Sequence, residues 1–154
     1  MPAIKVLLPY NFATQEEKAL DFVVNIFSHV KEAKVTLFNA YPALPTVDMG
    51  ASPELSKMKG PIASLSKELA EREEGLKSVR QHLIDNGFEP DRVDYIFKER
   101  KKSVAEEIAD VVTNGHYKIV VLSRQPVKVT RLFAKGVHSK LLSTLKNITI
   151  CIAT

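Results

Sequence analysis

The sequence predicts an α/β fold with a doubly wound, mainly parallel sheet of five strands and helices on both faces. Short apolar runs rich in leucine and β-branched residues alternate along the chain with segments of helical periodicity. The apolar runs are mostly continuous, which is typical of strands buried on both faces. Right-handed crossovers between such strands give a doubly wound domain. The 154 residues suffice for one such domain, covering residues 1–154.

The first half of the chain predicts strand, helix, strand and a long loop. Residues 3–8 form an apolar run that stops at Pro9. Thr14 and Glu17 form a capping box that opens a helix with apolar positions at helical spacing as far as Val30. Residues 34–40 predict the second strand. Residues 42–61 are rich in proline and glycine, so we expect either a functional lid or a flexible insertion there.

The second half predicts a long helix and then three further strands. From Ile62 to Leu83 apolar side chains recur every three or four residues, with a solvated charged face opposite them and an Asn-Gly pair at 86–87 as the stop. Ser103 and Glu106 form a second capping box. The remaining predicted elements are strands at 93–97, 118–122 and 148–152, and helices at 103–115 and 130–144.

Composition excludes several classes of protein. The single cysteine, Cys151, cannot form a disulfide within the chain, and no Cys/His spacing suits zinc, so we expect a reduced cytoplasmic location and no metal. We expect no secretory leader, because Met1 leads directly into a strand-like segment. No apolar stretch approaches the ~20 residues that span a bilayer, so we expect no membrane contact. No sequence motif supplies a catalytic nucleophile, so no catalytic residues are expected.

The basic residues are unevenly distributed. The net charge is +4, yet seven lysines and arginines and no acidic side chain follow Asp110. Such an excess indicates an anion site, a nucleic-acid face or only a solvated surface. The basic segment 98–102 joins this set, but neither it nor the segment after the fourth strand holds aromatic side chains for base stacking. We therefore do not expect nucleic-acid binding.

The order and spacing of these elements resemble the universal stress protein family over essentially the whole chain. The features that carry the resemblance are the opening strand with VLLPYN, the helix start TQEEKALDF, the strand KVTLFNA, the long loop with its charged helix, the SVAEEIAD helix start and the terminal strand-helix-strand unit. The resemblance implies an adenine nucleotide alpha hydrolase-like sheet of order 3-2-1-4-5. It also implies a homodimer joined through the last strand, from Ile148 to Ile152.

Many members of the family bind ATP through an Asp after strand one and a glycine motif, G-x-x-G-x9-G-[ST], after strand four. In this sequence the Asp position holds Asn11, and the glycine positions hold Leu122, Gln125 and Lys135. Gly136 restores the last glycine only with a shift of one residue. Bulky residues hinder the close approach of backbone N–H groups to phosphate.

A cation cluster can hold a phosphate by charge instead, and a helix start adds to it. The candidate nucleotide- or anion-binding residues are Pro9, Tyr10, Asn11, Asn39, Ala40, Ser123, Arg124, Lys128, Thr130, Arg131, Gly136, Val137 and His138.

Three functions compete on these observations. The first is a non-enzymatic regulatory or stress-response homodimer that acts through unidentified protein partners and does not bind ATP in the manner of the family. The second is a sensor of ATP, AMP or a small anion that uses the basic residues after strand four. The third is an enzyme, for which the sequence offers no positioned base, nucleophile or metal ligands. The first is our expectation, with no cofactor, and the second is the alternative.

Overall fold

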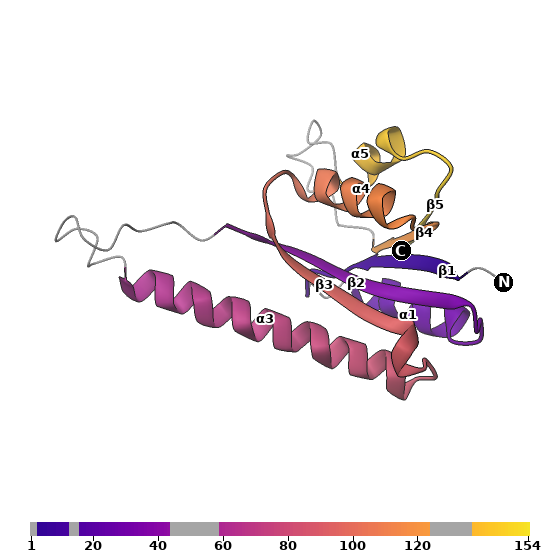
Figure 1. Cartoon of the computed structure of the whole chain (residues 1–154), viewed down its shortest axis with the longest axis horizontal. Helices are drawn as coiled ribbons and strands as arrows, with labels where there is room; N and C mark the ends of the chain where they lie inside the picture. Colours follow the sequence, from indigo (N-terminus) through magenta and orange to yellow (C-terminus); the bar gives the residue numbers. More distant parts are fainter. Residues whose placement is uncertain (1–2, 13–15, 44–58, 124–136) are drawn as a thin grey trace.

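The computed structural model describes residues 3–12, 16–43, 59–123 and 137–154, with the backbone alone at 59–62 and 137–139 (Figure 1). The elements, in chain order, are β1 (Ile4–Pro9), α1 (Glu16–Phe27), β2 (Ala33–Pro42), α3 (Lys59–Asp85), the short 3-10 helix η1 (Pro90–Arg92), β3 (Val93–Arg100), α4 (Val104–Gly115), β4 (Ile119–Ser123), α5 (Val137–Thr144) and β5 (Thr149–Ala153).

All five strands form one parallel sheet in the order β3-β2-β1-β4-β5. This confirms the predicted fold class and strand order. The chain builds one half of the sheet outward from β1 and then returns to place β4 on the other side of β1. The strand order therefore reverses between β1 and β4, and ligands of doubly wound sheets bind at the carboxyl ends of such a pair.

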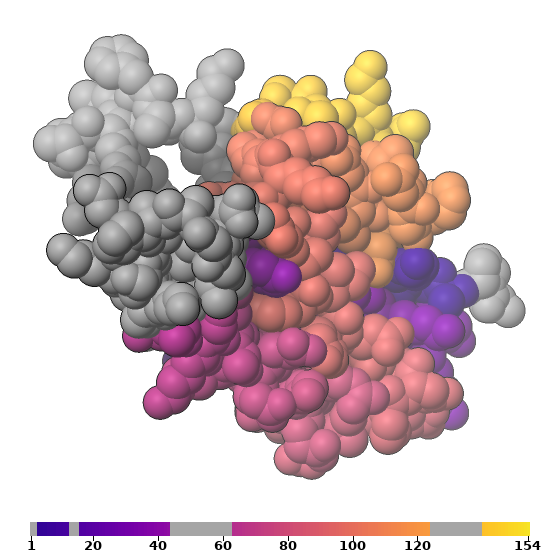
Figure 2. Space-filling model, turned by 60° about the vertical axis from the view of Figure 1, so that its left-hand side comes forward, coloured from indigo at the N-terminus to yellow at the C-terminus, as the bar shows by residue number. Residues whose placement is uncertain are grey.

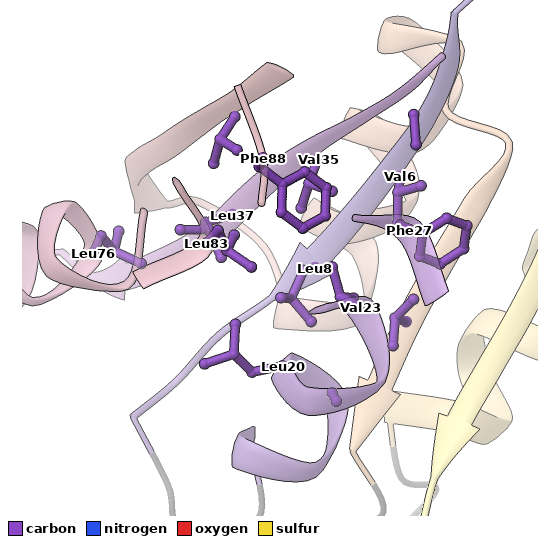
Figure 3. Packing of buried hydrophobic residues seen from close by; sticks show 14 residues of the cluster. Val6, Leu8, Leu20, Val23, Phe27, Val35, Leu37, Leu76, Leu83 and Phe88 are labelled. Atoms are coloured by element: carbon purple, nitrogen blue, oxygen red, sulfur yellow. The ribbon is translucent and has the colours of Figure 1, made fainter. Parts of the chain in front are cut away.

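Each face of the sheet has its own core, because neighbouring residues of a buried strand point to opposite sides. Val6 and Leu8 of β1 face α1 and α3, whereas Leu7 between them faces α4 and α5. Figure 3 shows Leu8 beside Leu20 and Val23 of α1. The first core cluster contains Val6, Leu8, Ala19, Leu20, Val23, Phe27, Ala33, Val35, Leu37, Leu76, Leu83, Phe88, Val93 and Val121. The second contains Leu7, Phe38, Ala105, Ile108, Ala109, Val112, Tyr117, Val120, Leu122 and Leu141.

Side chains close the helix ends. Ser103 accepts a hydrogen bond from the backbone N–H of Glu106, as its capping box predicts. The buried guanidinium of Arg92 donates to the backbone carbonyls of Phe27, Val30 and Ala33. These carbonyls lie at the end of α1, in the connection after it and at the start of β2, so one side chain joins the end of a helix to the beginning of a strand.

Several boundaries differ from the sequence prediction. The predicted loop 42–61 overlaps regular structure at both ends, since Pro42 ends β2 and α3 begins at Lys59. Pro61 fits there because the first turn of a helix needs no backbone N–H bond. Strand β3 continues to Arg100, so the basic segment 98–102 is partly strand rather than loop. Residues 130–136 of the predicted fourth helix lie outside the described part of the chain, as does Thr14 of the first capping box.

Helix α3 is longer than the sheet that it covers. Its C-terminal part carries the buried Leu76 and Leu83, whereas the side chains from 63 to 68 are exposed. Figure 1 shows this N-terminal part extending past the strands. In Figure 2, α3 and the pair α4 and α5 lie on opposite sides of the surface shown.

Candidate functional site

The candidate site lies at the carboxyl ends of β1, β2 and β4. Pro9 is the last residue of β1, with Tyr10 and Asn11 directly after it, and Ser123 is the last residue of β4. The structure therefore brings these four predicted site residues to the edge where the strand order reverses. Because β2 continues to Pro42, the predicted residues Asn39 and Ala40 lie within that strand and not, as expected, in the connection after it.

The basic part of the predicted site lies outside this description. Arg124, Lys128, Thr130, Arg131 and Gly136 belong to residues 124–136, which the structure does not describe. The backbones of Val137 and His138 open α5, and their side chains are likewise not described. An anion site built from these cations stays a prediction.

Asn39 joins β2 to the chain that follows β1. Its Nδ2 donates a hydrogen bond of 2.8 Å to the backbone carbonyl of Tyr10, and the Tyr10 N–H donates to the carbonyl of Phe38 at 2.8 Å. The Asn39 side chain is buried, with 6% of the residue exposed. Its Oδ1 has no hydrogen-bond partner among the residues that the structure describes. A buried acceptor without a donor is uncommon and costs free energy.

Glu16, which sequence analysis did not single out, is the second buried polar group of this edge. It is the first residue of α1, and only 5% of it is exposed. Burial raises the pKa of its carboxyl group from 4.5 to about 7, although a hydrogen bond with the Ser123 side chain acts in the opposite direction. Its Oε2 has no hydrogen-bond partner in the described part of the chain. The carboxyl group is thus distributed between its neutral and ionised forms near pH 7.

A signal for Glu16 was present in the sequence. The residue stands three positions before Ala19, four before Leu20 and seven before Val23, all of which are buried. This is the spacing of a single helix face. An acidic residue on the apolar face of a predicted helix would have marked the position.

The Tyr10 phenol responds to the same environment. Burial raises its pKa, and the carboxylates of Glu16 and Glu17 raise it further. The Tyr10 ring packs edge-on against that of Phe12, with 5.1 Å between ring centres. Phe12 has a φ of 66°, and its ring lies so close to Gly75 of α3 that a Cβ there would come within 2.7 Å of it. Aromatic packing thus fixes the chain after β1 against α3.

Leu122 lies in β4, one residue before the end of the strand. This residue stands at the first glycine position of the family motif, but here it is a regular strand residue that pairs with Ile152 of β5. Its buried side chain belongs to the second core cluster. Strand pairing and a packed side chain therefore hold Leu122 in place.

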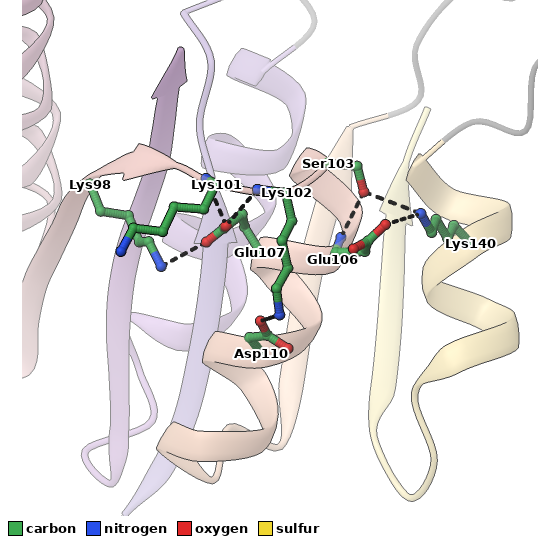
Figure 4. A network of polar contacts seen from close by, with 8 residues as sticks. All are labelled: Lys98, Lys101, Lys102, Ser103, Glu106, Glu107, Asp110 and Lys140. Atoms are coloured by element: carbon green, nitrogen blue, oxygen red, sulfur yellow. Dashed lines mark hydrogen bonds and ion pairs between the residues drawn. The ribbon is translucent and has the colours of Figure 1, made fainter. Parts of the chain in front are cut away.

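Acidic side chains of α4 pair with two of the four basic side chains of the segment 98–102. Buried Glu107 accepts from the backbone N–H groups of Lys101 and Lys102 at 3.1 Å, and its Oε2 lies 2.7 Å from Nζ of Lys98 (Figure 4). The hydrogen bond from Lys98 contributes most to lowering the pKa of Glu107. Asp110 pairs with Lys102 at 2.7 Å. This network anchors the connection from β3 to α4.

Other functional classes find no support in the described residues. No group of three or more His, Cys, Asp or Glu side chains in that part of the chain could hold a metal ion. No helix there is long and apolar enough to cross a membrane. The side chains of three histidines are described. His29 lies in the connection before β2, His82 lies near the end of α3, which leads to β3, and His116 lies in the connection before β4. They therefore lie toward the amino edge of the sheet, away from Ser123.

This geometry defines the class of the protein. It is a doubly wound α/β domain whose candidate site lies where the strand order reverses between β1 and β4. Within that class, solved structures of universal stress proteins share the fold. The protein UspA from Lactobacillus plantarum matches with a TM-score of 0.70 and 13% identity, covering 100% of this chain and 99% of that one. A universal stress protein from Archaeoglobus fulgidus in complex with dAMP matches with a TM-score of 0.63 and 12% identity, covering 100% of both chains.

A further universal stress protein, in complex with cAMP, matches with a TM-score of 0.60 and 12% identity, covering 99% of this chain and 98% of that one. By sequence, no family model matches, and no curated protein matches either. The chain therefore has the universal stress protein fold, as its sequence predicts.

Proposed function

We propose that this chain is a non-enzymatic regulatory protein of the universal stress type, which acts as a homodimer and does not hold ATP through a glycine loop. The observation that carries this proposal is Leu122, whose strand pairing and core packing replace the first glycine of the phosphate loop. Buried Glu16 beside Ser123 adds a carboxyl group close to the same point. A carboxylate repels phosphate, so both features disfavour a nucleotide phosphate there.

The arrangement of Ser123, Glu16 and the described histidines supports the non-enzymatic part of the proposal. At the end of β4, the Ser123 side chain forms a hydrogen bond with the carboxyl group of Glu16. Serine nucleophiles are activated by an adjacent base that a third group orients, usually a histidine between hydroxyl and carboxylate. The three described histidines lie toward the opposite edge of the sheet. We therefore propose no hydrolytic role for this pair.

Calorimetry with ATP tests the nucleotide part of the proposal. The protein is denatured, freed of any carried-over ligand and refolded before titration. We expect no binding at millimolar ATP. Micromolar binding would contradict the proposal and would show that other groups replace the glycine loop.

Strand β5 supports the proposed homodimer. It is an edge strand of the sheet and, among the described residues, pairs with β4 alone, so its other side can pair with a second copy. Ile152 of this strand is 40% exposed, whereas Ile150 packs against the second core cluster of its own chain. Two copies that pair through β5 would cover the exposed isoleucine of each.

Light scattering on Ile152→Lys tests this interface, because the exposed position tolerates lysine in the monomer but not in an apolar contact. Leu142→Lys on α5 is the matched control, since that leucine is 59% exposed and lies on a helix. We expect monomer from the first variant and dimer from the second. A dimer that persists in Ile152→Lys would place the interface elsewhere.

The second candidate is a sensor of AMP or another small anion. The complexes of fold relatives with dAMP and cAMP favour it, as does the basic excess after Asp110. Replacing both Arg124 and Arg131 by Glu should then abolish affinity for AMP or phosphate with little change in melting temperature. Unchanged affinity would remove these arginines from the site.

A further inference from the structure

Strand β3 forms the edge of the sheet opposite β5. It pairs with β2 over all eight of its residues, from Val93 to Arg100, and the register has no break. Proteins protect such edges with short strands, proline, bulges or charged side chains, because a long regular edge is a template for another strand. Strand β3 contains no proline, and in Figure 2 it reaches the surface between α3 and α4. This edge is therefore long and regular, and only its charged side chains restrict pairing.

The direction of the backbone groups of β3 follows from its register. Neighbouring residues of a strand direct their N–H and C=O groups to opposite sides. The Tyr10 N–H donates to the Phe38 carbonyl, so even-numbered residues of β2 bond toward β1 and odd-numbered ones toward β3. Val35 faces Val93 in the register, and only one of two facing residues in a parallel pair bonds across, so the odd-numbered residues of β3 point outward. The hydrogen bond of 2.8 Å from Arg80 of α3 to the Val93 carbonyl agrees with this direction.

Three outward residues, Tyr95, Phe97 and Glu99, leave their backbone groups unpaired within the described part of the chain. They are spaced two residues apart and are symmetrical about Phe97. A second copy of β3 that runs antiparallel matches this pattern, because Phe97 then bonds with Phe97 of the other copy and Tyr95 bonds with Glu99. Such an arrangement has a twofold axis, which is the commonest symmetry of homo-oligomers.

The charged side chains of β3 select this register. Asp94 is exposed and Arg100 is half-buried, and neither is in an ion pair among the described residues. In the arrangement centred on Phe97, Asp94 of each copy lies directly opposite Arg100 of the other, in a non-hydrogen-bonded pair where side chains approach most closely. A centre at Lys98 would oppose two lysines, and a centre at Ile96 would leave Arg100 beyond the start of the other strand.

We propose that β3 pairs antiparallel with β3 of a second copy of this chain, centred on Phe97 and selected by two Asp94–Arg100 ion pairs. This contact goes beyond the proposed β5 homodimer and does not depend on it, since it uses the opposite edge of the sheet. The paired segment is short, so the contact is weak, with half-association at about 0.1–1 mM. At high concentration the two contacts together join dimers into larger assemblies.

Sedimentation equilibrium of Ile152→Lys tests the β3 contact in isolation, because this variant removes the proposed β5 contact. We expect monomer at about 10 µM and dimer at about 1 mM. Adding Asp94→Arg or Arg100→Asp places like charges opposite each other and should weaken the association at least about tenfold. Asp91→Arg is the matched control, since Asp91 is exposed and precedes the strand, and it should leave the association unchanged. Melting temperatures check that each variant is folded.

Mixing the two charge variants gives the sharpest test. The Asp94→Arg chain has arginine at both positions, and the Arg100→Asp chain has aspartate at both. In a mixture each arginine faces an aspartate, so the mixture should associate at about 1 mM although neither variant does so alone. Only a contact in which position 94 of one copy faces position 100 of the other predicts this result. The double variant with both exchanges should likewise associate.

Three results would overturn the inference: Ile152→Lys that stays monomeric at about 1 mM, association that Asp94→Arg leaves unchanged, or a mixture of the charge variants that stays monomeric. The first would leave the β3 edge for an extended segment of another protein. If Ile152→Lys is instead a dimer at about 10 µM that Asp94→Arg leaves intact, the proposed β5 interface fails. The β3 contact then predicts tetramers of that variant at about 1 mM, and their absence would overturn it, so the two failures are distinguishable.

Discussion

Replacing Glu16 by glutamine should stabilise the protein, and the gain should depend on pH. The carboxyl group is buried at the start of α1, and its pKa is raised to about 7 from an ordinary value of 4.5. Each unit of pKa difference between folded and unfolded states corresponds to about 1.4 kcal/mol. The raised pKa therefore amounts to about 3 kcal/mol lost from the free energy of unfolding once the group is ionised.

The sign follows from the direction of the shift. A folded-state pKa above the unfolded value gives a stability contribution that is complete below about pH 4.5 and is lost as the pH rises through about 7. Glutamine keeps an acceptor for Ser123 and never ionises. The variant should match the wild type near pH 4.5 and exceed it by about 3 kcal/mol at about pH 8. For a chain of this size the gain corresponds to a melting temperature roughly 6–12 °C higher.

Urea denaturation of both proteins between about pH 4.5 and pH 8 measures this difference directly. Glu17→Gln is the control, because Glu17 occupies the same turn of α1 and is exposed. We expect its free energy of unfolding to follow the wild type at every pH. A Glu16→Gln variant that shows no gain at about pH 8, or the same gain at every pH, would refute the assignment of a buried carboxyl group with a raised pKa.

Two further predictions concern the polar groups that hold the fold together. Arg92→Met should lower the free energy of unfolding by about 3 kcal/mol in urea titrations, because three backbone carbonyls lose a buried charged donor, whereas exposed Arg72→Met should change it by less than about 0.5 kcal/mol. Glu107→Gln should cost about 2 kcal/mol near pH 7, and, because the folded pKa is lowered, the difference should fade as the pH drops below about 4.5. Exposed Glu99→Gln in β3 is its control, and a cost for Glu107→Gln that is independent of pH would argue against the ion pair with Lys98.

Much of the fold could be predicted from local signals. The apolar runs at 3–8, 34–40 and 118–122 coincide with β1, β2 and β4 to within one or two residues, apart from the extra length of β2. Alternating apolar runs and helical periods are properties of neighbouring residues, so they can be read from the chain itself. The element boundaries at Pro42, Lys59 and Arg100 could not, because strand ladders and helix starts there continue through residues of unfavourable propensity.

The candidate site was predicted only in part. The rule that ligands bind beyond the carboxyl ends of strands placed Tyr10 and Ser123 at one edge, as the structure does, whereas Asn39 lies within β2. Glu16 was missed although its helical spacing placed it on the apolar face of α1. The segment 98–102 was interpreted as a basic loop, since its acidic partners Glu107 and Asp110 come from the following helix.

The sequence by itself determined the order of elements, the two buried faces of the sheet and the residues other than glycine at 122, 125 and 135, because these depend on residue type and on spacing along the chain. Only the tertiary structure decided the charge states and partners at the carboxyl edge. Burial of Glu16 beside Ser123 raises the pKa of its carboxyl group, and Asn39 Nδ2 donates to the backbone carbonyl of Tyr10. Desolvation and hydrogen bonding depend on groups that are distant in sequence and meet only in the folded chain.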